Sequence, residues 1–106
     1  MYEGDFVNDK REGNGKYVFE DGKYYIGEFK NHLMNGKGKE YYKNGSIKYE
    51  GNFVNDKYKG NGKYIWESGN FYIWEFKNNL RNGKGKEYYI NGDIDEGDWI
   101  NAKFIS

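Results

Sequence analysis

The sequence contains no cysteine and no proline, and it has a single histidine among its 106 residues. Without cysteine there is no disulfide, no thiolate metal site and no cysteine nucleophile. Lys+Arg and Asp+Glu number 17 each, so the cationic excess that a nucleic-acid binder needs is missing. No apolar run approaches the roughly 18 residues of a membrane span, and no signal peptide opens the sequence. We therefore expect a cytoplasmic protein.

Aromatic residues and glycine are abundant instead. Phe, Trp and Tyr make up 21% of the residues, and there are 16 glycines. Disordered chains are poor in aromatics and carry a high net charge, so this composition predicts a folded chain. Its length fits one domain, 1–106.

An internal repeat organises this domain. Residues 2–45 and 49–92 are identical at 32 of 44 aligned positions. Each of these long units divides again, because a leading tyrosine recurs at Tyr2, Tyr25, Tyr49 and Tyr72. The predicted units are about 2–24, 25–48, 49–71 and 72–94, followed by a partial unit, 95–106, that lacks its second strand.

Each unit alternates with period two over five to seven residues, which is typical of half-buried strands. Asp21-Gly22, Asn44-Gly45 and Asn91-Gly92 are signals for tight turns between strands. The predicted fold is therefore all-β: a single elongated antiparallel meander of stacked β-hairpins, with about nine strands.

The strand alternation also divides the side chains between two faces. One face carries the tyrosine and phenylalanine of each unit, with glycines between them over which rings can lie. The other face carries acidic residues on the first strand of a unit and basic residues on the second strand, so neighbouring strands present opposite charges. Ile26, Val54 and Ile100 interrupt its polar surface. They suggest a homodimer contact, through this outer face or through a sheet edge.

The pattern YxGxF, followed by GxGxY and DGxxYxG, resembles the MORN repeat over residues 2 to about 101. Residues 41–53 are also similar to the variant found in bacterial antitoxin-like MORN proteins. The resemblance implies hairpins stacked into a curved, open, trough-like sheet with a non-catalytic role in protein–protein contact. Binding to phosphoinositide membranes has also been proposed across the family.

Trp74 departs from this pattern, because it stands where the other units have Gly4, Gly27, Gly51 and Gly97. It either fills a local gap or anchors a partner, since tryptophan is enriched at interface hot spots. We predict a glycine-lined aromatic trough with Trp74 as the anchor. The other predicted binding residues are the rings that flank Trp74, namely Tyr49, Phe53, Tyr72 and Phe76, and four further aromatics, namely Tyr25, Phe29, Trp66 and Trp99.

Catalytic and cofactor motifs fail on inspection. GNGK and GKGK lack the spacing, the Ser or Thr and the following helix of a phosphate-binding loop. His32 falls in a loop without a neighbouring nucleophile, and Glu28 and Glu75 repeat with the module rather than forming one site. The acidic cluster at 93–98 does not match a calcium loop. We expect no enzyme, no cofactor and no metal.

The expected partner is another protein, held along the trough. One alternative is a small antitoxin or inhibitor that blocks an enzyme such as a nuclease or toxin. Another is recruitment to anionic membranes, against which the zero net charge argues. Carbohydrate or single-stranded nucleic acid stacked on the rings is less favoured. Nucleic acid would add a basic track, and here acidic residues interleave with the lysines.

Overall fold

The computed structural model describes residues 1–106 as one antiparallel sheet with the strands in chain order. No helix is present, and hence none that could cross a membrane. The ten strands are β1 (Tyr2–Val7), β2 (Lys10–Val18), β3 (Tyr24–Lys30), β4 (Leu33–Tyr41), β5 (Ile47–Val54), β6 (Lys57–Ile65), β7 (Phe71–Lys77), β8 (Leu80–Tyr88), β9 (Ile94–Ile100) and β10 (Lys103–Phe104). The predicted meander of hairpins is confirmed.

The fifth unit differs from the prediction, because it does have a second strand. Its two residues, Lys103 and Phe104, pair with Ile100 and Trp99 of β9. The Phe104 ring packs against Trp99 with ring centroids 5.2 Å apart, and the main chain of Ile105 and Ser106 bonds to Asp98. The chain therefore ends in a short hairpin folded against β9.

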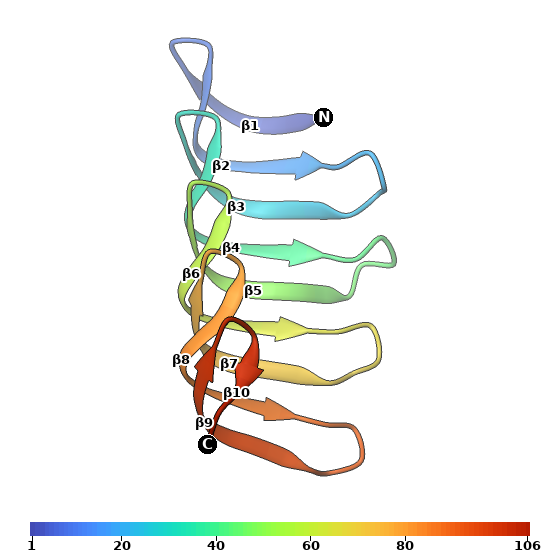
Figure 1. Ribbon diagram of the computed structural model, residues 1–106. Coiled ribbons are helices and arrows are strands. Elements are labelled where there is room, and N and C mark those ends of the chain that lie inside the picture. The colour runs from blue at the N-terminus through green and yellow to red at the C-terminus, as the bar shows by residue number, and fades with distance from the viewer.

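Two kinds of turn join the strands (Figure 1). The turns predicted at Asp21-Gly22, Asn44-Gly45 and Asn91-Gly92 link one unit to the next. Inside each unit a two-residue turn joins the strands, and both of its residues have φ between 48° and 71°. Asparagine, which tolerates this left-handed region, comes first in all five of these turns: 8–9, 31–32, 55–56, 78–79 and 101–102.

The sheet is bent rather than flat. The strand register shifts at Gly4/Phe6, Gly27/Phe29, Gly51/Phe53 and Trp74/Phe76, in the strands that lead into four of the five two-residue turns. Such irregularities bend a strand and increase its twist. Figure 1 shows that each hairpin bends near its two-residue turn. The strand segments on the side of that turn (the bent arms) curl away from the longer segments on the other side (the long arms), so the sheet forms an open trough. Its overall extents are 47 × 27 × 17 Å.

The core lies inside the bend and is built almost entirely of rings. Each leading tyrosine makes an edge-to-face contact with the phenylalanine of its own strand and with the aromatic residue of the next unit's first strand. The second set, at centroid distances of 5.0–5.3 Å, comprises Tyr2–Phe29, Tyr25–Phe53, Tyr49–Phe76 and Tyr72–Trp99. This aromatic ladder spans every unit boundary, and no second layer covers it.

Glycine lets the ladder form. A Cβ placed on Gly38 would meet the ring and hydroxyl of Tyr25, and Gly15, Gly62 and Gly85 relate in the same way to Tyr2, Tyr49 and Tyr72. Rings do pack over glycines, but the prediction had the wrong ones: each ring covers a glycine of the neighbouring strand of its own unit rather than the glycine between the aromatics of its own strand.

Charged pairs occupy the outer face. Lys39 bonds Glu50 at 3.7 Å and Lys86 bonds Glu96 at 3.8 Å, both across a boundary between units. Two aromatic pairs also stack there, Tyr24 on Tyr41 and Phe71 on Tyr88. Because these pairs are partly exposed, their net contribution to the stability of the sheet is small.

Candidate functional site

Most of the predicted binding residues form the core. Their exposed fractions are 0–5% for Tyr25, Phe29, Tyr49, Phe53, Tyr72, Phe76 and Trp99. These seven rings contact one another and leave almost no surface to a partner. Trp66 is half-buried and Trp74 is 41% exposed, so these two retain surface for contact.

The trough itself is lined by a second set of side chains. Along the long arms, one column alternates Tyr17, Glu40, Tyr64 and Glu87, and the next contains Phe19, Tyr42, Trp66 and Tyr89. Tyr42 and Glu87 are buried, and the other six are partly exposed. A hollow of about 380 Å³ lies at the N-terminal end, between Arg11, His32 and Asp56 of the bent arms and Tyr17 and Phe19 of the long arms.

Two arginines occupy equivalent positions near the ends of the trough. The Arg11 guanidinium lies 5.0 Å from the Tyr17 ring centroid. The Arg81 guanidinium lies 5.0 Å from the ring centroids of both Trp66 and Trp99, and it pairs with Glu87, which is buried. Between them, the Tyr58 hydroxyl donates to Glu40. The trough surface therefore consists of aromatic rings in contact with arginine side chains and of paired charges, and it contains no pair of free carboxylates.

Tyrosines around this core have perturbed pKa values. Burial is the main cause: it raises the pKa of Tyr72 to about 12, with the Glu75 carboxylate adding to it. Burial also raises the pKa of Tyr25, Tyr49 and Tyr58, and Glu40 contributes at Tyr58. Each shift means that the folded state favours the neutral phenol.

These shifts predict alkaline unfolding. The folded state holds the phenolic protons more tightly than the unfolded chain, whose tyrosines ionise near pH 10. The stabilisation is therefore complete below about pH 10 and is lost as pH rises toward 12. We expect tyrosinate absorbance at 295 nm and loss of far-ultraviolet circular dichroism to appear together in this range. Ionisation of all tyrosines near pH 10 with the fold intact would contradict it.

Trp74 lies outside the aromatic core. Its φ is 105°, in the region that L-residues rarely adopt, and none of the ring–ring contacts of the core involves it. On the core side Tyr72 is fully buried and its hydroxyl donates to the Glu75 carbonyl, as in the other units, so no space remains there for an indole. Gly85, which pairs with Trp74, is buried, whereas Gly38 and Gly62 are not. We infer that the indole covers Gly85 from the outer face.

A shallow groove on the outer face follows the same glycine columns. It has a volume of about 720 Å³, and Gly27, Gly38 and Gly51 line it together with Lys39 and Glu50. It reaches Asn61 on β6, next to the strand that carries Trp74. The glycine-lined groove and the aromatic trough thus lie on opposite faces of the sheet.

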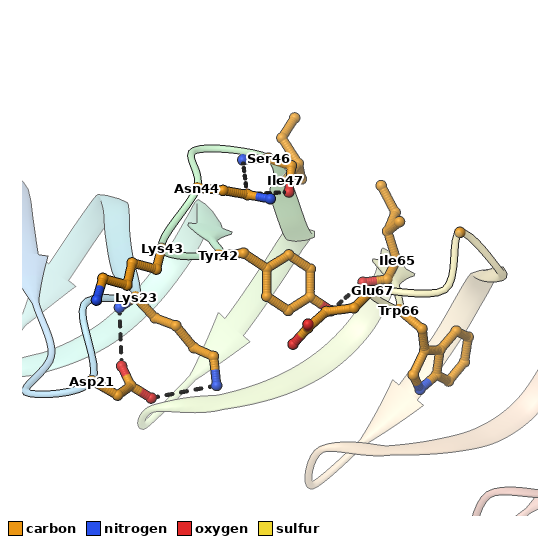
Figure 2. Close-up of a pocket in the computed structure, with 11 residues that line it drawn as sticks. Asp21, Lys23, Tyr42, Lys43, Asn44, Ser46, Ile47, Ile65, Trp66 and Glu67 are labelled. Atoms are coloured by element: carbon orange, nitrogen blue, oxygen red, sulfur yellow. Dashed lines mark hydrogen bonds and ion pairs between the residues drawn. The ribbon is translucent and has the colours of Figure 1, made fainter.

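Another hollow, of about 610 Å³, lies among the turns that link the units (Figure 2). The Tyr42 hydroxyl donates to the Ile65 carbonyl, Lys23 pairs with Asp21, and Ser46 bonds to Asn44. Each of these polar groups is engaged by a neighbour, so their arrangement serves the turns.

The sequence did not reveal how the two-residue turns join one unit to the next. His32 Nδ1 accepts from the Arg11 N–H at 3.3 Å, and the His32 N–H donates to the Arg11 carbonyl at 3.1 Å. Asp56 and Asn79 bond Met34 and Tyr58 in the same way. The recurrent Asn-x pair before each second strand was the available signal. His32 is exposed, as predicted, and its ring nitrogen serves this structural bond.

The acidic cluster at 93–98 is largely paired. Asp95 accepts from the Tyr89 hydroxyl at 2.8 Å, Asp98 pairs with Lys84 at 2.6 Å, and Glu96 pairs with Lys86 at 3.8 Å. Nowhere in the structure do three His, Asp or Glu side chains gather as a metal ion would require.

A family model, MORN repeat, matches the chain four times, at residues 2–24, 25–47, 49–71 and 75–94. The first three matches begin at a leading tyrosine, and the fourth begins directly after Trp74. Together they cover most of the sequence, and they agree with the stacked hairpins of the sheet. The chain belongs to the MORN-repeat family.

Proposed function

We propose that this chain is a non-catalytic module that binds another protein, with Trp74 as a central contact. MORN repeats are commonly protein- or membrane-binding modules, which supports the general class. The observation that carries the proposal is Trp74 itself, a 41% exposed indole on a backbone at φ 105°. Such strained conformations cost about 1–3 kcal/mol and cluster at functional sites.

The outer groove supplies the surroundings of this contact. Its floor is main chain at Gly27, Gly38 and Gly51, so an extended segment can approach closely. Trp74 stands in the same column one unit further on, where it can pack against the end of such a segment. Because the sheet is already ordered, binding costs little conformational entropy on this side.

The trough is the second surface for the same function. Tyr, Trp and Arg are the residues enriched at interface hot spots, and Tyr17, Trp66 and Arg11 supply them there in contact with neighbouring side chains. A partner in the trough would touch these residues rather than the buried ladder.

Trp74→Gly tests the proposal. Glycine occupies the equivalent position of four other units, so the fold should persist, and relief of strain opposes the packing lost with the indole. Capture of a partner from source lysate by immobilised protein is expected to fall at least tenfold, with unchanged circular dichroism. Leu80→Ser, at a residue that is 42% exposed, is the matched control and should capture normally.

The outcome of this capture also separates the surfaces. If Trp74→Gly loses capture of the partner and Phe19→Ser does not, the binding site is on the outer face. If Trp74→Gly captures as much partner as the wild type and Phe19→Ser loses capture, the site is in the trough. If the captured partner is an enzyme, its activity with and without the module distinguishes an inhibitor from an adaptor.

A further inference from the structure

Trp74 and the outer groove lie in one row across the sheet. The strand register aligns the members of this row from β2 to β9: Gly15, Gly27, Gly38, Gly51, Gly62, Trp74, Gly85 and Gly97. The indole is the one side chain among these glycines. A face that carries both a projecting ring and a groove for such a ring can pair with a second copy of itself about a two-fold axis, because the same patch then serves both subunits.

A two-fold axis that runs along the strands, between β5 and β6, brings the ring and the groove together. It turns the outer faces of two copies toward each other and reverses the strand order, so β5 faces β6 and β4 faces β7 of the second copy. Trp74 on β7 then lies opposite Gly38 on β4. Gly38 is flanked in the outer groove by Gly27 and Gly51. By symmetry the contact is made twice.

The groove at Gly38 suits an indole. Its floor is glycine main chain, and its volume of about 720 Å³ is open to the outer face. Lys37, Lys39 and Tyr41 line its sides. Lysine ammonium groups are attracted to the face of an indole, and a covered tryptophan buries about 150–250 Å² of surface. The groove therefore offers both close approach and favourable electrostatics to this ring.

The same axis sets charges of opposite sign against each other. In the row beside the glycines, Lys16 of β2 lies opposite Glu96 of β9, and Glu50 of β5 lies opposite Lys63 of β6. The remaining positions of that row, from β3 to β8, set isoleucine against lysine. No like charges meet in this row, which favours a second copy of the chain as the occupant.

A further pair lies on the other side of the glycine row. Lys37 precedes Gly38 and Glu75 follows Trp74, and because β4 and β7 run in opposite directions these two residues face each other across the axis. Both side chains are exposed, and neither takes part in an ion pair within the chain. One Glu75 oxygen accepts from the Lys84 N–H at 3.2 Å, which leaves the other oxygen for a lysine of the second copy.

We propose that this chain forms a face-to-face dimer in which Trp74 of each copy occupies the outer groove of the other. The inference rests on the proposed function, because both use Trp74 as a contact on the outer face. It adds a form of regulation: the second copy competes with another protein for Trp74, so the dimer masks the binding site.

Sedimentation equilibrium of the purified full chain, from about 10 to 500 µM, tests the dimer without any other protein. We expect the wild type to dimerise reversibly over this range. Trp74→Gly removes the ring from both contacts, so it should raise the dissociation constant of the dimer at least tenfold with unchanged circular dichroism.

A charge exchange tests the geometry of the contact. Lys37→Glu sets two carboxylates against each other at both contacts and Glu75→Lys sets two lysines, so each variant alone should dimerise at least fivefold more weakly. In an equimolar mixture both contacts become pairs of opposite charge, and dimerisation should return to within twofold of the wild type. Lys57→Glu makes the same charge change at an exposed lysine beside a two-residue turn and should dimerise normally.

A wild type that stays monomeric at about 500 µM would overturn the proposal. So would equal dimerisation of Trp74→Gly, a mixture as weak as its two components, or an equal loss in Lys57→Glu. These results are independent of partner capture. A monomeric wild type whose partner is lost in Trp74→Gly would overturn the dimer and support the proposed function, whereas a dimer lost in Trp74→Gly with unchanged capture would do the reverse.

Discussion

Replacing Tyr49 with alanine is expected to remove a large part of the free energy of unfolding of the protein. Tyr49 has no exposed surface, and its ring contacts Phe53, Tyr58 and Phe76 at centroid distances of 5.1, 3.9 and 5.3 Å. Truncation of a buried aromatic ring costs about 3–5 kcal/mol, and a small domain has about 5–15 kcal/mol in total. With one layer of core, the sheet cannot collapse around the cavity. Urea unfolding followed by circular dichroism measures the loss.

Two variants calibrate this result. Tyr49→Phe keeps the ring and removes the hydroxyl that donates to the Asn52 carbonyl, and it should cost about 1–3 kcal/mol. Tyr2→Ala truncates the terminal ring of the ladder, which is only half-buried, and should cost less than Tyr49→Ala. Equal losses for Tyr2→Ala and Tyr49→Ala would show that the ladder does not carry the stability of the sheet.

Gly38→Ala is expected to destabilise the protein by about 3 kcal/mol, at the upper end of the cost of overpacking. The φ of Gly38 is not in the left-handed region, so backbone strain makes no contribution. The added methyl group would collide with the ring and hydroxyl of Tyr25, which is fully buried and has no free space to move into. The free energy of unfolding from urea titration measures the effect.

A double-mutant cycle assigns this cost to the ring. In a Tyr25→Leu background the methyl group has room, and Gly38→Ala should then cost less than about 1 kcal/mol. Additive losses in the double variant would mean that the glycine serves the backbone rather than the tyrosine.

The repeat allowed the hairpins and the two faces to be predicted, and also that rings pack over glycines, although the rings cover the glycines of the neighbouring strand. Period two assigns a residue to a face but does not say whether a neighbour covers it. Tyr25 is buried because Phe53, two strands away, packs on it, and this contact depends on the bend of the sheet. For this reason seven of the nine predicted trough residues became the core, and Tyr17, Phe19 and the predicted Trp66 line the trough.

Trp74 shows a second limit of the sequence pattern. Alternation places it on the same face as Tyr72 and Phe76, but its φ of 105° lies in a region that glycine adopts readily and other residues rarely do. At the equivalent positions Gly4, Gly51 and Gly97 have φ of 151–154°. A side chain on such a backbone does not follow the pleat. Its direction depends on the space left by Tyr72, which only the structure reveals.

The affinity of Trp74→Gly for the captured partner tests the central claim most directly. Titration calorimetry with purified partner would compare wild type, Trp74→Gly and Leu80→Ser under the same conditions. A hot-spot tryptophan contributes 2 kcal/mol or more, so the Kd of Trp74→Gly should rise about 30-fold while that of Leu80→Ser stays within twofold. Equal affinities of wild type and Trp74→Gly would contradict the proposal that Trp74 anchors a partner.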